Sequence, residues 1–362
     1  MTRRITPRRY LGTFTALTLV GVLALVWNAD YYRQAITGHA QMMLARVAID
    51  DLVEQPDVDP ALREQLGLAS RIREFATAEL TLPDNDSYRH YASLERDHAV
   101  WTVTALPEFS LSPKEWCYPI VGCQTYRGYF DEERARAMAQ QLRNQGYEVV
   151  VGGTSAYSTL GFFDDPITDV MLARSDAALA DLLFHELAHQ RLFVRGDTMF
   201  NEGYANFVGE QGVREWLGAR GESVKLQRWQ ARREQTQVFR DLLLETRDRL
   251  DALYASSISP EAMREQKADI LGDTRMVFDQ QLVANHPGLA RFRSWFDEPV
   301  TNARLARVAT YRKWMPAFRT LYEMHDGDWA AFHHAVEELA ELPRAARDER
   351  LRSYMAEPPT AL

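Results

Sequence analysis

The chain has 362 residues, of which 46% are hydrophobic and 26% are charged, which is ordinary for a folded globular protein with a sizeable core. Its formal net charge is −9, and lysine and arginine are sparse and unclustered after the N-terminus. With no basic segment interleaved with aromatic residues, the sequence argues against a nucleic-acid partner.

The first segment is basic and then apolar. Its arginines are Arg3, Arg4, Arg8 and Arg9. The uncharged run from Tyr10 to Trp27 that follows would reach about 27 Å as a helix, close to the bilayer core of about 30 Å. The arginines before this run, against Asp30 after it, predict a single-pass anchor over residues 1–29 with the remainder across the membrane. A cleaved signal peptide is the alternative, although residues 27–29 lack a small-x-small cleavage site.

Residues 30–97 are expected to form a helical N-terminal region. From Tyr31 to about Phe75, apolar residues recur near i, i+3 and i+4. The stretch 57–60 interrupts this pattern, and 83–85 ends it with turn residues.

From residue 98 to 161 the composition favours strands. Segments rich in Val, Thr, Tyr and Phe predict strands at 99–106, 123–130, 147–153 and 155–162. A helix is expected between them, with Asp131 as N-cap and Gly146 at its end. Cys117 and Cys123 are the only cysteines, and in an extracytoplasmic domain they predict a disulfide, with two buried free thiols as the alternative.

Nearly everything after residue 175 is predicted to be helical. The long segments are 223–255, 260–283, 304–322 and 328–342. A small mixed sheet followed by helices is an α+β arrangement. We expect a core at 98–220 and a helical C-terminal region at 221–362 that completes a cleft.

One predicted helix carries a metal-binding pattern. It starts after Ser175, a good N-cap, and contains His-Glu-Leu-Ala-His. His185 and His189 are four residues apart, so they project from nearly the same side and can reach one tetrahedral ion. Glu186 lies beside the first histidine, where it can take a proton from water at the metal. A structural histidine pair is the alternative.

A second predicted helix follows, with Asp197 as N-cap, and supplies a third ligand. Glu202 lies thirteen positions after His189, and a helix returning after a short turn would bring it beside the histidines. An ordinary acid near a helix N-terminus is the alternative role of Glu202, and Glu210 is the fallback ligand. Asn206 is a candidate to accept a hydrogen bond from a ligating histidine.

These two segments resemble the gluzincin metallopeptidases. The metzincin pattern is absent, since Leu192 and Arg195 stand where it has Gly and His. The chain is more similar to a bacterial family described as putative aminopeptidases, over roughly residues 30–350. The likeness includes the segments FHELAHQ, FNEGYANF, EWCYPIVGCQTYRGYF, AYSTLGFFDDPI and NARLARVATY. It implies a zincin-like catalytic core. The histidine spacing predicts one zinc ion, and the N-terminal anchor predicts a catalytic domain in the periplasm, held on the inner membrane.

The expected activity is hydrolysis of peptides by zinc-activated water, with Glu186 as base and His185, His189 and Glu202 as metal ligands. An aminopeptidase is implied by the resemblance, and Asp164 or Asp165 could hold the free amine of a peptide. Since no GxMEN-type motif is present, a zinc endopeptidase is an alternative, as is a non-catalytic envelope protein with a structural metal. The segment 156–163 is a candidate edge strand for a bound peptide.

Overall fold

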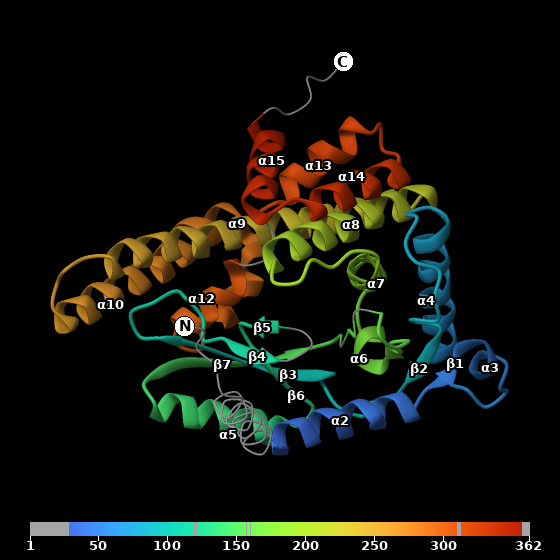
Figure 1. Ribbon diagram of the computed structural model, residues 1–362, viewed down its shortest axis with the longest axis horizontal. Coiled ribbons are helices and arrows are strands. Elements are labelled where there is room, and N and C mark those ends of the chain that lie inside the picture. Colours follow the sequence, from blue (N-terminus) through green and yellow to red (C-terminus); the bar gives the residue numbers. More distant parts are fainter. Residues whose placement is uncertain (1–28, 119–121, 157, 160, 310–312, 357–362) are drawn as a thin grey trace, which may run out of the picture.

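The computed structural model describes residues 29–118, 122–156, 158–159, 161–309 and 313–356 (Figure 1). The predicted anchor at 10–27 lies outside these residues. No described helix is both long enough and apolar enough to cross a bilayer. The first, α2 (Ala29–Leu44), has 16 residues and carries charged and polar side chains, whereas a membrane span needs about 20 apolar residues. The predicted single-pass inner-membrane location, with its N-terminal membrane contact, is therefore corrected.

The N-terminal region is helical, as predicted. After α2 come α3 (Ile49–Val53) and α4 (Pro60–Ala78). The α4 helix begins where the sequence predicts a break, because the carboxylate of Asp59 accepts hydrogen bonds from the amides of Ala61 and Leu62. Pro60 occupies its first turn, where a missing amide hydrogen costs nothing.

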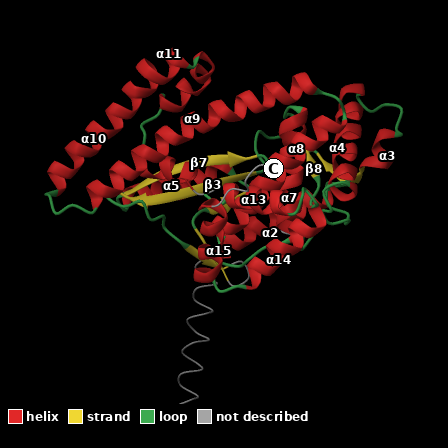
Figure 2. Ribbon diagram, turned by 90° about the horizontal axis from the view of Figure 1, so that it is seen from above, coloured by secondary structure: helices red, strands yellow, loops and turns green. Residues whose placement is uncertain are grey.

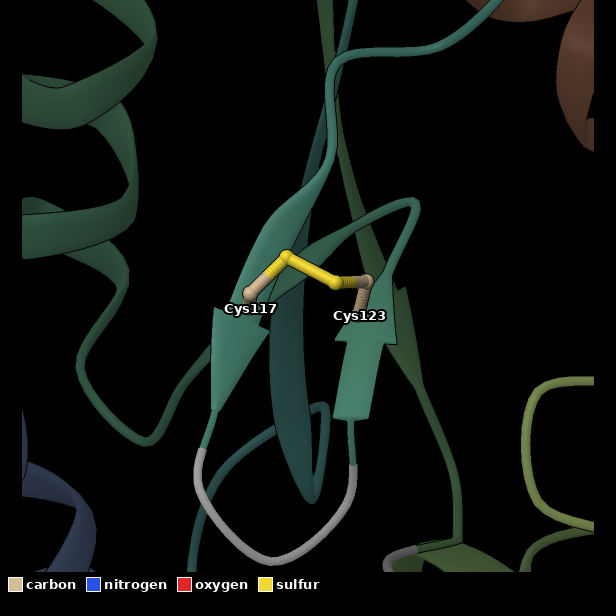
Figure 3. Close-up of a disulfide and its surroundings, with 2 residues drawn as sticks. All are labelled: Cys117 and Cys123. Atoms are coloured by element: carbon tan, nitrogen blue, oxygen red, sulfur yellow. A yellow bond between two sulfur atoms is a disulfide. The ribbon is translucent and has the colours of Figure 1, made fainter.

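The strands form three small sheets. They are β1 (Val47–Ala48), β2 (His90–Ala92) and β8 (Ile167–Thr168); β6 (Arg127–Tyr129), β3 (Val100–Pro107) and β7 (Tyr147–Thr154); and the hairpin β4 (Trp116–Tyr118) and β5 (Gly122–Gln124). In the first sheet β2 pairs antiparallel with β1 and parallel with β8. In the second, β3 lies between antiparallel β6 and β7. The predicted disulfide joins Cys117 to Cys123 across the hairpin (Figure 3).

Helix α5 (Glu132–Asn144) covers one face of the β6–β3–β7 sheet. Its buried Ala135, Ala139 and Leu142 pack against Val103 and Ala105 of β3. As predicted, Asp131 caps this helix by accepting a hydrogen bond from the amide of Arg134.

The predicted strand at 155–162 is wrong. None of its described residues is in a strand, and a turn forms instead. The amide and hydroxyl of Thr159 both donate to the carboxylate of Asp165, and Gly161 has φ +81°. The side-chain bonds close this segment on itself, and the left-handed glycine redirects the chain, so it cannot extend alongside β7.

The remaining helices complete the fold. They are α6 (Asp169–Leu172), α7 (Asp176–Arg191), α8 (Thr198–Ala219), α9 (Ser223–Tyr254), α10 (Pro260–Val277), the π-helical turn η1 (Phe278–Leu282), α11 (Val283–Asn285), the 3-10 segment η2 (Pro287–Phe296), α12 (Asn302–Ala309), α13 (Met315–Met324), α14 (Trp329–Glu341) and α15 (Arg344–Ala356). The predicted helix at 304–322 is two helices, because Pro316 opens α13. We therefore correct the fold class: the described chain is mostly helical with three small sheets, and the expected α+β architecture with one zincin-like mixed sheet is wrong.

Two apolar cores hold the helices together. The larger joins α4, α7, α8, α13 and α14 and includes Phe184, Phe207 and Trp216. The smaller is built from α9, α10, η1 and η2 around Phe239 and Phe278. Helices α9 and α10 lie side by side and extend away from α7, while α8 runs through the larger core (Figures 1 and 2).

Candidate metal centre

The two histidines lie on α7, as the sequence predicts. Leu183, Phe184 and Leu187 fix this helix in the larger core. His189 is 6% exposed, and its ring meets the ring of His185 edge-on with centroids 4.6 Å apart. The helical spacing therefore places both imidazoles together at the edge of the core.

A short turn, residues 192–197, returns the chain from α7 to α8. Asn201 clamps it, because the side-chain amide donates to the carbonyl of Val194 and accepts from the amide of Val194, both at 2.8 Å. Asp197 caps α8 at the amide of Phe200 and forms a buried ion pair with Arg347 at 2.6 Å. These bonds set the direction in which α8 leaves the turn.

Two glycines of α8 allow it to approach α7 closely. A β-carbon at Gly209 would lie 2.7 Å from Oδ1 and 2.8 Å from the main-chain oxygen of Asp181. At Gly212 it would lie 2.7 Å from the ring of Phe184. Since real β-carbons need more space, any larger residue would push the helices apart. The close approach brings Glu202, two turns earlier on α8, opposite the histidines.

The three predicted ligand side chains converge. His185 Nε2 and His189 Nε2 are 3.1 Å apart, and the Glu202 carboxylate oxygens lie 3.6 Å and 3.5 Å from them. Two ligands about 2.0–2.1 Å from a tetrahedral zinc ion are separated by about 3.3 Å. The separation of the two nitrogens is close to this value, and one ligand atom from each of the three side chains lies within 4.8 Å of the others, so the group could hold one metal ion.

The protonation preferences of His185 and Glu202 suit metal binding, whereas that of His189 favours the protonated ring, whose proton a metal ion would displace. Burial, with the positive charge of His189, lowers the pKa of His185 to about 4, so this imidazole is neutral near pH 7. For Glu202, burial alone would raise the pKa, but bonding to His189 outweighs it and lowers the pKa of the carboxyl. For His189, burial disfavours the cation, but contact with Glu202 outweighs it and raises the pKa. Glu202 thus presents an anionic carboxylate to the imidazoles.

Glu186 lies in a different environment from the three predicted ligands. Burial raises the pKa of its carboxyl, and the Ser158 hydroxyl opposes this by hydrogen bonding. Tyr88 is buried nearby, and its pKa is raised by burial and by the charges of Glu186 and Asp165. Burial, together with the charge of Glu186, raises the pKa of Asp165 to about 7 against the Thr159 hydrogen bonds. The carboxyl of Glu186 therefore holds a proton more readily than an exposed glutamate does.

Other predicted site residues have different positions. Glu210 is buried and paired with Arg214, Arg233 and Arg319 at 2.8–3.1 Å, so it is not in the cluster that could hold a metal. The side-chain amide of Asn206 donates to the main-chain carbonyl of Glu202 at 2.6 Å.

The candidate amine-binding acids also differ from expectation. Asp165 is fully buried and bonded to Thr159, so a substrate amine cannot reach it. Asp164 is exposed, and its carbonyl accepts from Arg46.

The sequence of the chain matches one family of known proteins. A family model described as "Putative aminopeptidase" matches residues 30–351. The chain belongs to this family. No curated protein and no solved structure matches it. The putative aminopeptidase family indicates a hydrolase that acts on peptide bonds.

An ion-pair network that the sequence did not predict connects the helices that carry the two histidines and Glu202. Arg233 of α9 donates to Asp181 of α7 at 2.9 Å and to Glu210 of α8 at 2.8 Å. Asp181 lies one helical turn before His185, so this arginine joins the helix that carries His185 to the helix that carries Glu202. The residues of this network are far apart in the sequence. Asp181, an acid four residues before His185, was the one sequence feature that could have pointed to it.

Proposed function

We propose that the protein is a zinc-dependent peptidase that removes residues from the amino ends of peptides. The observation that carries the proposal is the convergence of His185, His189 and Glu202 within 3.1–3.6 Å, beside a carboxyl that is not among these ligands. A structural zinc site is normally closed by four protein ligands, whereas three leave a position for water and substrate. The unligated Glu186 favours catalysis over a structural role.

In the proposed reaction, three residues would bind the metal and Glu186 would transfer the proton. The three ligands hold the metal, which when bound polarises the scissile carbonyl and makes water more acidic. The Glu186 carboxylate accepts a proton from the attacking water as the water oxygen bonds to the carbonyl carbon. Glu186 then gives this proton to the amine nitrogen as the carbon–nitrogen bond breaks. One peptide bond and one water become a carboxyl group and an amine.

The direction of attack, from the amino end, rests on the family. The burial of Asp165 rules it out as a contact to the substrate amine. Asp164 is an exposed carboxylate. Glu186 and Glu202 are the acids at the centre itself. Cleavage of internal bonds is therefore the outcome against which the aminopeptidase activity must be tested.

The test uses the purified protein loaded with zinc and pairs of peptides that differ only in a free or acetylated amino terminus. We expect one equivalent of zinc and turnover of the free peptides alone. Glu186→Gln should keep the zinc and lose activity by about 100-fold or more, since a positioned base contributes 10²–10⁴-fold. Glu234→Gln, an exposed carboxylate on α9, is the charge-matched control.

Each contrary result has a separate meaning. Equal turnover of free and acetylated peptides would replace the aminopeptidase with an endopeptidase. Full activity in Glu186→Gln would remove the proposed base, and zinc-loaded protein that cleaves no peptide would defeat the peptidase proposal.

A further inference from the structure

Three phenylalanines are unusually exposed. Phe162, Phe163 and Phe193 are 72%, 53% and 40% exposed, while every other phenylalanine of the described chain is buried or half-buried. An exposed phenylalanine leaves a large apolar area in water, and clustered ones mark a binding surface more often than scattered ones do. Their positions in the fold therefore matter.

Phe193 lies beside the last turn of α7, which carries His189, and Phe162 and Phe163 follow Gly161, which lies against Gln190 of the same turn. Phe193 comes four residues after His189, and its ring lies 6.4 Å from the His189 ring, at 73° to it. On the other flank, Gly161 lies against the side chain of Gln190, where a β-carbon would be 3.5 Å away. The two residues after Gly161 are Phe162 and Phe163.

Local contacts hold both flanks in place. The ring of Phe163 packs against His39 of α2 with centroids 4.7 Å apart. The Thr159 hydroxyl donates to the carbonyl of Phe163 and accepts from its amide. Leu192 ends α7 in an extended conformation, so Phe193 leaves the helix axis next to the histidines. The rings are thus presented by bonded turns.

The charged residue between these flanks is already engaged. Arg191, at the end of α7, pairs with Glu337 at 3.0 Å and donates to the carbonyl of Thr81. Its charge is therefore directed toward α14 and the end of α4. Phe193 is thus an exposed apolar side chain whose ring lies beside that of a predicted ligand.

We propose that Phe193 is a specificity-determining residue, whose ring contacts the substrate side chain next to the scissile bond. The enzyme would then prefer peptides with a large apolar residue, such as leucine or phenylalanine, at that position. This inference rests on the proposed peptidase function. An apolar contact beside the metal centre strengthens binding of such residues but gives nothing to small or charged ones.

The experiment compares kcat/KM for peptides identical except at the residue before the scissile bond, which is Leu, Phe, Ala, Ser, Glu or Lys. Mass spectrometry identifies the bond that is cut. We expect Leu and Phe peptides to exceed the Ala peptide by about 10–200-fold, the range that one hydrophobic contact provides. Phe193→Ala should reduce this ratio about tenfold while the bound zinc is unchanged.

Two further variants separate specificity from folding. Phe193→Leu keeps an apolar side chain and should restore most of the preference. Ile258→Ala removes another exposed apolar side chain, in the turn between α9 and α10 at the far end of that helix pair from α7 (Figure 1), and should leave the ratio unchanged.

The possible results test the specificity of Phe193 separately from the proposed peptidase activity. Cleavage of all six peptides at similar rates would overturn the proposed specificity and leave the peptidase standing. An equal loss for every peptide in Phe193→Ala would also overturn it. If the zinc-loaded protein cleaves none of them, the peptidase and the specificity fail together.

Discussion

Replacing Gly209 with alanine tests whether helix packing sets the metal geometry. The added carbon would meet the main-chain oxygen of Asp181 at 2.8 Å, whereas such carbon–oxygen contacts lie at about 3.3–3.6 Å. Main-chain atoms cannot rotate away, so α8 must retreat by about 0.5 Å. Overpacking costs about 1–3 kcal/mol, and the better helix propensity of alanine returns up to about 1 kcal/mol. We expect a net destabilisation of about 1–2 kcal/mol.

The same retreat should weaken zinc binding. Metal–ligand distances tolerate about 0.2 Å, less than the displacement expected between α7 and α8, so affinity should fall about tenfold or more. The assays are urea unfolding of the metal-free protein and competition for zinc with a chelating dye. Gly218→Ala is the matched control, because a β-carbon there meets nothing within 4 Å; it should be neutral or stabilising by up to about 1 kcal/mol. Wild-type stability and zinc affinity in Gly209→Ala would refute the reasoning.

Three other outcomes are expected. Glu202→Ala should lower zinc affinity by more than the roughly 10–100-fold that loss of a supporting residue causes, as measured by the same competition; unchanged affinity would remove this ligand. Arg233→Met should destabilise the protein by about 2–3 kcal/mol in urea, because it strips Asp181 of its partner while Glu210 retains two arginines. Burial lowers the pKa of His333 to about 3, so its stabilising contribution is complete above about pH 6.5 and is lost as the pH falls toward 3. The free energies of unfolding obtained from urea titrations at pH 7.5 and 5.5 should therefore differ by about 1 kcal/mol more in the wild type than in His333→Gln.

Local signals in the sequence predicted the helices and the strands β3 and β7 well, but missed the short strands β1, β2, β4 and β8 and placed a strand wrongly at 155–162. Caps such as Asp131 and Asp197 act within three residues, so the beginnings of α5 and α8 could be read directly. The segment 155–162 has the composition of a strand, but its conformation is set by a hydrogen bond to Asp165, outside the segment. Strand formation depends on a neighbouring strand, which composition does not reveal.

The site shows the same division. His185 and His189 are brought together by helical periodicity alone, and their juxtaposition needed no knowledge of the fold. Glu202 required one further assumption, that α8 returns alongside α7. Arg233 lies more than thirty residues further along the chain, so no local pattern could connect it to the histidines.

The contacts that place the ligands are independent of any metal. Asn201 fixes the turn, Gly209 sets the separation of α7 from α8, and Arg233 ties the same two helices from behind. A site arranged in this way gives up little conformational entropy when it binds an ion, which favours high affinity. Changes in packing or charge one or two turns from the predicted ligands should therefore alter zinc affinity. In an exposed site on a flexible loop, only loss of a ligand would alter it. Changes at Gly209 and Gly218, on one helix and chemically identical, separate these two descriptions.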